Sequence, residues 1–322
     1  MSQTSGATYT VNQRRLLDRL ATMAAIGATD GGGVTRLALS DEDKQARDLL
    51  ATWMSEAGLE VRIDDVGNMT GHRPGRRDLS PVLIGSHLDT IVKGGRFDGV
   101  LGVLAALEVV ETLNDHQVTT ELSIAIVNWT NEEGVRFEPA MTCAGVAAGR
   151  FTVEEIHDKV DRAGLRFGDE LRRIGYFGNE RNRPLPASAY LELHIEQGPV
   201  LEAADAPVGI VGGIVGITWS EVTITGQADH AGPSPMHLRH DALPRRPTSS
   251  PASNGSRSIR MKLPSPRSVA SRSARTSSIP SRALPCSASI SGTAILPSSK
   301  GNTSAWWNSW IGSARSGASM AK

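Results

Sequence analysis

The sequence predicts an α/β protein with a mostly parallel sheet flanked by helices. Apolar stretches of strand length alternate with segments of helical periodicity between residues 40 and 193. Three of these stretches end in His or Glu residues, and such ends gather at one edge of a parallel sheet. The composition then changes abruptly near residue 243. We therefore expect one α/β unit followed by a segment of different character.

The expected elements follow one another in a regular order. Ser40 and Asp43 resemble a capping box, and apolar residues then recur at helical spacing as far as Gly58, which predicts an amphipathic helix. Strands are expected at 61–66, 81–85, 122–129, 189–193 and 217–225, and helices at 99–113 and from about 241 to 243.

Charge divides the chain into two unlike parts. All 34 acidic residues lie at or before Asp241, whereas residues 244–322 hold 9 Arg, 3 Lys and 22 Ser. Translation of a GC-rich gene in a wrong reading frame produces such a composition, and we favour it over a natural basic, disordered tail. Residues 1–243 carry a formal charge of −12, which argues against a nucleic-acid partner. An RNA-binding tail that stacks Trp306, Trp307 and Trp310 on bases remains an alternative.

The sequence also predicts a cytoplasmic protein without a membrane segment. The first ten residues are polar and lack a basic start, and no later apolar run approaches the length that crosses a bilayer. Cys143 and Cys286 offer neither a disulfide framework nor a CxxC metal motif.

Polar side chains with metal-binding chemistry cluster at the ends of three expected strands. They are His87, Asp89 and Asp98 after the first strand, Glu132 and Glu133 after the second, and His194 after the third. Mixed imidazole and carboxylate ligands suit zinc, manganese or cobalt. A carboxylate such as Asp98 can bridge two ions, and one of two adjacent glutamates can take a proton from water while the other coordinates. Asp89 is well placed to orient His87.

Each of these residues also has an ordinary structural explanation. A single histidine after a strand is usually a hydrogen-bonded core or surface residue, and Glu-Glu pairs are common on solvated faces. Their joint occurrence at three strand ends favours a metal site.

Five motifs in this order resemble the hydantoinase/carbamoylase group of M20 metallohydrolases. The motifs are Gly85-Ser86-His87-Leu88-Asp89-Thr90, Gly94-Gly95-Arg96-Phe97-Asp98-Gly99, Asn128-Trp129-Thr130-Asn131-Glu132-Glu133-Gly134, His194-Ile195-Glu196-Gln197-Gly198-Pro199 and Gly226-Gln227-Ala228-Asp229-His230-Ala231-Gly232. The group includes N-carbamoyl-L-amino acid hydrolases, allantoate amidohydrolases and β-ureidopropionases. The resemblance extends from about Asn12 to Leu243 and includes the segment from Gly32 to Leu37.

The resemblance implies a dinuclear metal site, with zinc ahead of manganese or cobalt. His87 and His194 would bind one ion, Glu133 would bind the other, and Asp98 would bridge them. Glu132 would activate the water between the ions, so that a metal-bound hydroxide attacks the substrate.

The resemblance also implies supporting roles outside the metal ligands. Asp89 would orient His87, and Gln197 would contact the substrate. His230 would polarise the scissile group, often from the partner subunit of a homodimer, although a strand end entering a turn is the structural alternative for this residue.

The implied activity is hydrolysis of linear C–N bonds in N-carbamoyl-L-amino acids or related ureido compounds. Allantoate amidohydrolase, β-ureidopropionase, M20 peptidase and an inactive metal-binding fragment remain alternatives.

The resemblance also implies a domain organisation. Residues 1–212 would form an M20 catalytic domain that lacks its C-terminal return, and residues 213–243 would form the start of an inserted α+β lid and dimerisation domain. Residues 244–322 would form an aberrant, disordered tail; they contain no histidine. The resemblance implies one further histidine ligand near the C-terminus, so the second metal position would lack this ligand, and we expect impaired activity.

Overall fold

A computed structural model describes residues 8–213, the backbone of strands at 217–225 and 287–295, and residues 227, 230 and 233–238. The chain divides into two compact units. Among the described residues, the first comprises residues 8–210, and the second comprises those from Val211 onward.

The first unit is built on a five-stranded mixed sheet. Its strands are β1 (Glu60–Ile63), β2 (Met69–Arg73), β3 (Val82–His87), β4 (Ile124–Trp129) and β5 (Ala189–Leu191). They lie in the order β1-β2-β4-β3-β5. β3 runs parallel to both β4 and β5, whereas β2 is antiparallel to β1 and β4. The expected parallel arrangement thus holds for the three strands that precede the polar clusters, and a β1-β2 hairpin extends the sheet at the other edge.

Three long helices share the main hydrophobic core with this sheet. They are α1 (Gln13–Ala25), α2 (Asp41–Glu56) and α3 (Val100–Asp115). The side chain of Ser40 accepts a hydrogen bond from the backbone N–H of Asp43, so the expected N-terminal cap of α2 is present. Leu50, Leu107 and Ile126 are fully buried in the core between the helices and the sheet. Such burial accounts for most of the hydrophobic stabilisation of the unit.

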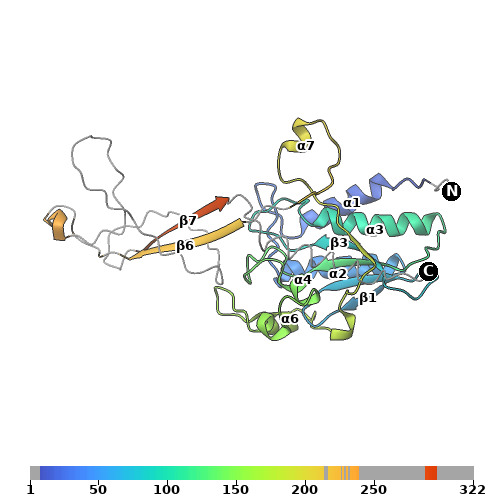
Figure 1. Ribbon diagram of the computed structural model, residues 1–322, viewed down its shortest axis with the longest axis horizontal. Helices are drawn as coiled ribbons and strands as arrows, with labels where there is room; N and C mark the ends of the chain where they lie inside the picture. Colours follow the sequence, from blue (N-terminus) through green and yellow to red (C-terminus); the bar gives the residue numbers. More distant parts are fainter. Residues whose placement is uncertain are drawn as a thin grey trace. The chain divides into compact units, whose positions relative to one another are not determined.

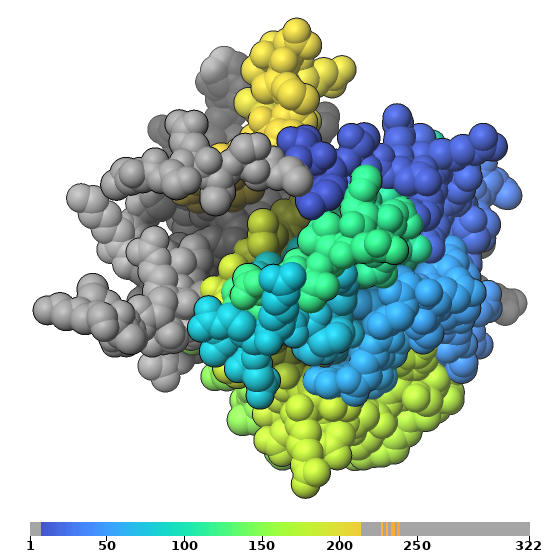
Figure 2. All heavy atoms as spheres, turned by 90° about the vertical axis from the view of Figure 1, so that its right-hand side faces the viewer, coloured from blue at the N-terminus to red at the C-terminus, as the bar shows by residue number. Residues whose placement is uncertain are grey.

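Helices α1 and α3 lie side by side (Figure 1 and Figure 2). Arg15 of α1 joins them, donating hydrogen bonds to Glu108 and Asp115 of α3. Helix α3 begins immediately after Gly99 and is largely buried, as expected for a helix that is apolar on most of its faces.

The opposite face of the sheet carries a smaller core. Leu83, Val127 and Trp129 form it with residues from the segment 185–190 and from α4. The shorter helices of the first unit are α4 (Thr142–Ala147), α5 (Val153–His157), α6 (Phe167–Arg173), the 3-10 helix η1 (Glu180–Asn182) and α7 (Val200–Ala203).

The second unit contains a two-stranded antiparallel sheet. Strand β6 (Ile217–Thr225) pairs with β7 (Ser287–Ile295), with Ile217 opposite Ile295, and the 3-10 helix η2 spans Met236–Leu238. The expected strand at 217–225 is therefore present, while the helix expected near 241–243 lies outside the described residues. β7 belongs to the segment for which we predict a frameshift; apart from β7, that segment also lies outside them. No helix among the described residues is long and apolar enough to cross a membrane.

Candidate metal centre

His87 is the last residue of β3 and its side chain is almost completely buried. Its Nδ1 atom lies 2.8 Å from the backbone carbonyl oxygen of Asp89. A neutral imidazole that donates from Nδ1 presents the lone pair of Nε2 to a cation. The backbone contact therefore fixes both the ring and the tautomer that metal binding requires.

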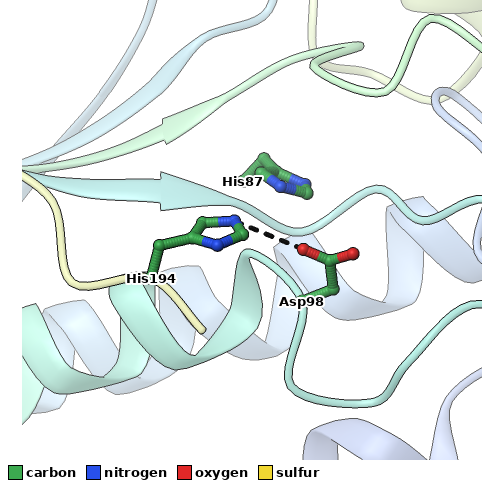
Figure 3. Close-up of side chains that lie close together, drawn as sticks. All are labelled: His87, Asp98 and His194. Atoms are coloured by element: carbon green, nitrogen blue, oxygen red, sulfur yellow. Dashed lines mark ion pairs between the residues drawn. The ribbon is translucent and has the colours of Figure 1, made fainter. Parts of the chain in front are cut away.

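Asp98 and His194 complete a cluster with His87 (Figure 3). Asp98 lies in the loop before α3, and His194 lies three residues after the end of β5. The Nε2 atom of His194 is 3.3 Å from Oδ1 of Asp98. One ligand atom from each of the three residues lies within 4.8 Å of the other two. In the part of the chain that the structure describes, this is the single group of three or more such ligands.

The opposite charges of His194 and Asp98 stabilise each other. The hydrogen bond to Asp98 raises the pKa of His194 to about 9, because the carboxylate stabilises the imidazolium. The same contact lowers the pKa of Asp98. Gln197 also donates a hydrogen bond of 2.7 Å from Nε2 to Oδ2 of Asp98. The structure thus places Gln197 beside the cluster.

Asp89 connects the cluster to the next strand end. Its buried carboxylate accepts hydrogen bonds from the backbone N–H groups of Glu132 and Glu133, at 3.1 and 3.2 Å. Its Oδ1 atom is 4.0 Å from Nδ1 of His87. Asp89 therefore contacts the imidazole through its backbone oxygen, and its side chain holds the segment that follows β4.

Glu132 and Glu133 differ in their contacts with the cluster of His87, Asp98 and His194. Oε2 of Glu132 lies 3.6 Å from Nε2 of His87. Glu133 is not among the residues whose ligand atoms gather with His87. Burial raises the pKa of Glu132, and it raises the pKa of Glu133 to about 7. A nearby cation would favour the ionised form of both side chains.

The donor set fits a divalent transition metal. Two imidazole nitrogens and a carboxylate oxygen are typical ligands of zinc. Ligand atoms around a tetrahedral zinc lie about 3.3 Å apart when each is about 2 Å from the ion. The 3.3 Å between His194 and Asp98 agrees with that spacing, whereas the wider overall spread requires a small adjustment on binding.

Two elements of the site were given no role in the sequence prediction. Gly99 has φ of +66°, and a Cβ atom there would lie 2.5 Å from the His87 ring, so this position needs glycine. Ser86 donates a hydrogen bond to Glu192, which joins the ends of β3 and β5. Gly99 and Ser86 stand inside recognised motifs, whereas the pairing of Ser86 with Glu192 has no local sequence signal.

His230 belongs to the second unit. It is exposed, and residues 228, 229, 231 and 232 around it lie outside the described part of the chain. Its expected role therefore stays a prediction.

Comparisons with known proteins agree with this chemistry. The model of peptidase family M20/M25/M40 matches residues 83–304 and so runs into the Ser-rich segment. The N-carbamoyl-L-amino-acid amidohydrolase of Rhizobium meliloti is 48% identical over 238 residues, which cover 74% of this chain and 57% of the relative. The allantoate amidohydrolase of Bacillus subtilis is 35% identical, covering 71% of this chain and 56% of the relative.

Solved structures of hydantoinase/carbamoylase family amidases are also similar to this chain. A hydantoinase/carbamoylase family amidase from Burkholderia vietnamiensis matches with a TM-score of 0.69 and 51% identity, covering 72% of this chain and 56% of that one. A family member from Burkholderia ambifaria matches with a TM-score of 0.65 and 48% identity, covering 73% and 58%. The chain thus spans little more than half the length of these relatives.

Proposed function

Because this chain belongs to peptidase family M20/M25/M40, within its hydantoinase/carbamoylase group, we propose that it carries the metal-binding part of an amidohydrolase. The substrates would be N-carbamoyl-L-amino acids or related ureido compounds, whose linear C–N bonds are hydrolysed. The convergence of His87, Asp98 and His194 beside the Glu132-Glu133 pair is the observation that carries this proposal.

The proposed ligands are distributed over two metal positions. His87 and His194 would hold one divalent ion, Glu133 would contribute to a second, and Asp98 would bridge them. When bound, such ions lower the pKa of water and polarise the substrate carbonyl. Zinc agrees best with the imidazole-rich set, and manganese or cobalt would also fit.

Glu132 would act as the proton carrier. Its carboxylate accepts a proton from the attacking water, whose oxygen bonds to the carbamoyl carbon. As the C–N bond breaks, Glu132 returns a proton to the leaving nitrogen. Asp89 supports this role, because its hydrogen bonds to the backbone of Glu132 and Glu133 restrict where both side chains can reach.

Substrate contacts are proposed for two further residues. Gln197 lies beside Asp98 and has an amide that can bind a carbamoyl or carboxylate group. His230 would polarise the scissile carbonyl from the second domain, in the manner that the family resemblance implies. A homodimer would bring this histidine to the partner subunit's site.

The carbamoyl substrates are favoured over allantoate by sequence identity. The named N-carbamoyl-L-amino-acid amidohydrolases from Rhizobium meliloti and Geobacillus stearothermophilus are 48% and 43% identical, against 35% for the Bacillus subtilis allantoate enzyme.

A cytoplasmic location is proposed as well, since the buried Cys143 is a free thiol.

We expect the chain to be impaired as a catalyst. Residues 244–322 contain no histidine, so they do not supply the further histidine ligand that the resemblance implies. One metal position would therefore bind more tightly than the other.

The test is a comparison of substrates with the full chain loaded with zinc. We expect slow release of free amino acid from N-carbamoyl-L-amino acids, abolished by a chelator, and slower reaction with allantoate. Cleavage of dipeptides alone would instead support a peptidase. Zinc binding without turnover of any substrate would identify an inactive metal-binding fragment.

A further inference from the structure

Arg36 lies between α1 and α2 with its side chain completely buried. Its Nε atom donates a 2.7 Å hydrogen bond to the backbone oxygen of Leu88. Its Nη1 atom donates to the backbone oxygens of Ile26 and Met23, at 2.9 and 3.2 Å. One buried guanidinium thus connects the end of α1 to the segment that follows His87.

The backbone of Arg36 holds the same segment from the other side of Asp89. The N–H of Arg36 donates to Oγ1 of Thr90 at 2.9 Å, and the N–H of Thr90 donates to the carbonyl oxygen of Arg36 at 2.8 Å. Leu88 and Thr90 are both buried. Arg36 therefore fixes the two residues that flank Asp89, through three hydrogen bonds shielded from water.

Asp89 transmits this constraint to the proposed reactive residues. Its backbone oxygen orients His87, and its carboxylate accepts from the backbone of Glu132 and Glu133. A shift of the 88–90 segment would therefore move the imidazole and loosen both glutamates together. Groups that support metal ligands in this way typically change metal affinity about 10- to 100-fold.

The charge of Arg36 also acts close to the site. Burial lowers the pKa of Arg36, and the negative charges of Asp43 and Asp89 oppose that effect. A methionine of similar length would remove both the donors and the charge, whereas lysine would keep the charge on one flexible ammonium group, without the planar fork of the guanidinium.

We propose that Arg36 is a positioning residue of the metal centre, acting through Leu88, Asp89 and Thr90 on His87 and the glutamate pair. The inference rests on the proposed metal-binding function. It adds a residue that lies outside the ligand set and touches neither metal nor substrate.

The experiment measures zinc dissociation constants of the full-length chain and its variants by chelator competition, at a temperature where circular dichroism shows each to be folded. For Arg36→Met we expect binding about tenfold weaker than for the parent chain, and for Arg36→Lys an intermediate loss. Thr90→Val removes the acceptor for the Arg36 N–H together with the hydroxyl that donates to the carbonyl oxygens of Ile91 and Val34, and we expect a loss of about threefold.

Arg15→Met is the matched control. Arg15 is bonded to Glu108 and Asp115 and joins α1 to α3, without a hydrogen bond to the 88–90 segment. This variant should lower the unfolding midpoint but keep the zinc affinity within about twofold, a change too small for a lost ligand support.

The outcomes distinguish failure of the proposed metal site from failure of the proposed role of Arg36. If the parent chain binds no zinc, the metal site itself is wrong. If the parent binds zinc and Arg36→Met binds it as tightly as Arg15→Met does, the role of Arg36 is overturned. Should Arg36→Met fail to fold, Arg36→Lys and Thr90→Val decide: weaker binding supports the role of Arg36, and unchanged affinity in both overturns it.

Discussion

Gly99 lies so close to the imidazole of His87 that a Cβ atom at position 99 would stand 2.5 Å from the ring atoms Cδ2, Cε1 and Nε2. Real side chains do not approach one another so closely, so the ring would have to move. We therefore expect Gly99→Ala to weaken zinc binding by about tenfold, because displacing a ligand disturbs the geometry that the metal requires. Chelator competition measures the change.

The control for this substitution is Gly32→Ala. Gly32 has φ of +78°, close to the +66° of Gly99, but a Cβ atom there has no neighbour within 4 Å. Gly32→Ala should therefore cost stability through backbone strain alone and leave zinc affinity unchanged. Equal loss of affinity in both variants would show that backbone strain, and not contact with His87, is responsible.

Glu132→Gln should separate metal binding from hydrolysis. Oε2 of Glu132 lies 3.6 Å from His87, but the proposed role of this residue is proton transfer. We expect the variant to keep zinc affinity within about threefold and to lose hydrolysis of N-carbamoyl-L-amino acids by about 100-fold or more. His194→Gln should instead lose zinc. Loss of zinc from both variants would make Glu132 a ligand rather than a base.

Ser86→Ala should weaken zinc binding several-fold. The hydroxyl of Ser86 donates to Glu192, and these residues stand next to His87 and two positions before His194. Removing the bond should loosen the two strand ends that carry the imidazoles. The zinc dissociation constant reports the effect.

Ser188→Ala provides a control at the other end of the same two strands. Ser188 donates a 2.6 Å hydrogen bond to the backbone oxygen of Ser80, before β3 and β5 begin. Its loss should leave zinc affinity unchanged. If Ser188→Ala weakens binding as much as Ser86→Ala, general stability of the strand pair explains both results.

Arg47→Met should destabilise the first unit by about 3–5 kcal/mol, because it leaves the charge of Asp43 buried and unpaired. Both side chains are completely buried, with Nε of Arg47 2.9 Å from Oδ2 of Asp43. Arg47 also donates to Gly67 and Thr130. Urea denaturation followed by circular dichroism measures the loss.

Adding Asp43→Asn to Arg47→Met removes the unpaired charge, so the double variant should lose less stability than the two single variants combined. Strict additivity would contradict a coupled pair.

Several elements with strong local signals were predicted well, although helix α1, which Asn12 caps, was missed. The cap at Ser40 and the periodicity after it located α2, and the apolar runs ending at His87 and Trp129 located β3 and β4. Because these two strands are parallel neighbours, the rule that strand ends gather at one edge also predicted the proximity of His87 to Glu132.

Other features depend on contacts that no local pattern encodes. Strand β2 was missed, and its antiparallel pairing with β4 is set by the β1-β2 hairpin. The contact between Asp89 and His87 uses a backbone oxygen, which sequence alone does not reveal. Arg36 stood in a recognised motif without a role, because its acceptors are carbonyl groups of distant residues. The short helices α4 to α7 have only four to seven residues each, which is too short for a helical periodicity to show in the sequence.

The most direct test of the account is the zinc content of the full chain, measured by mass spectrometry after zinc loading and desalting. We predict about one tightly bound ion per chain, lost in His87→Ala and Asp98→Ala. Fewer than about 0.1 ion per chain, or equal zinc in the parent and both variants, would contradict a metal centre at the ends of β3 and β5.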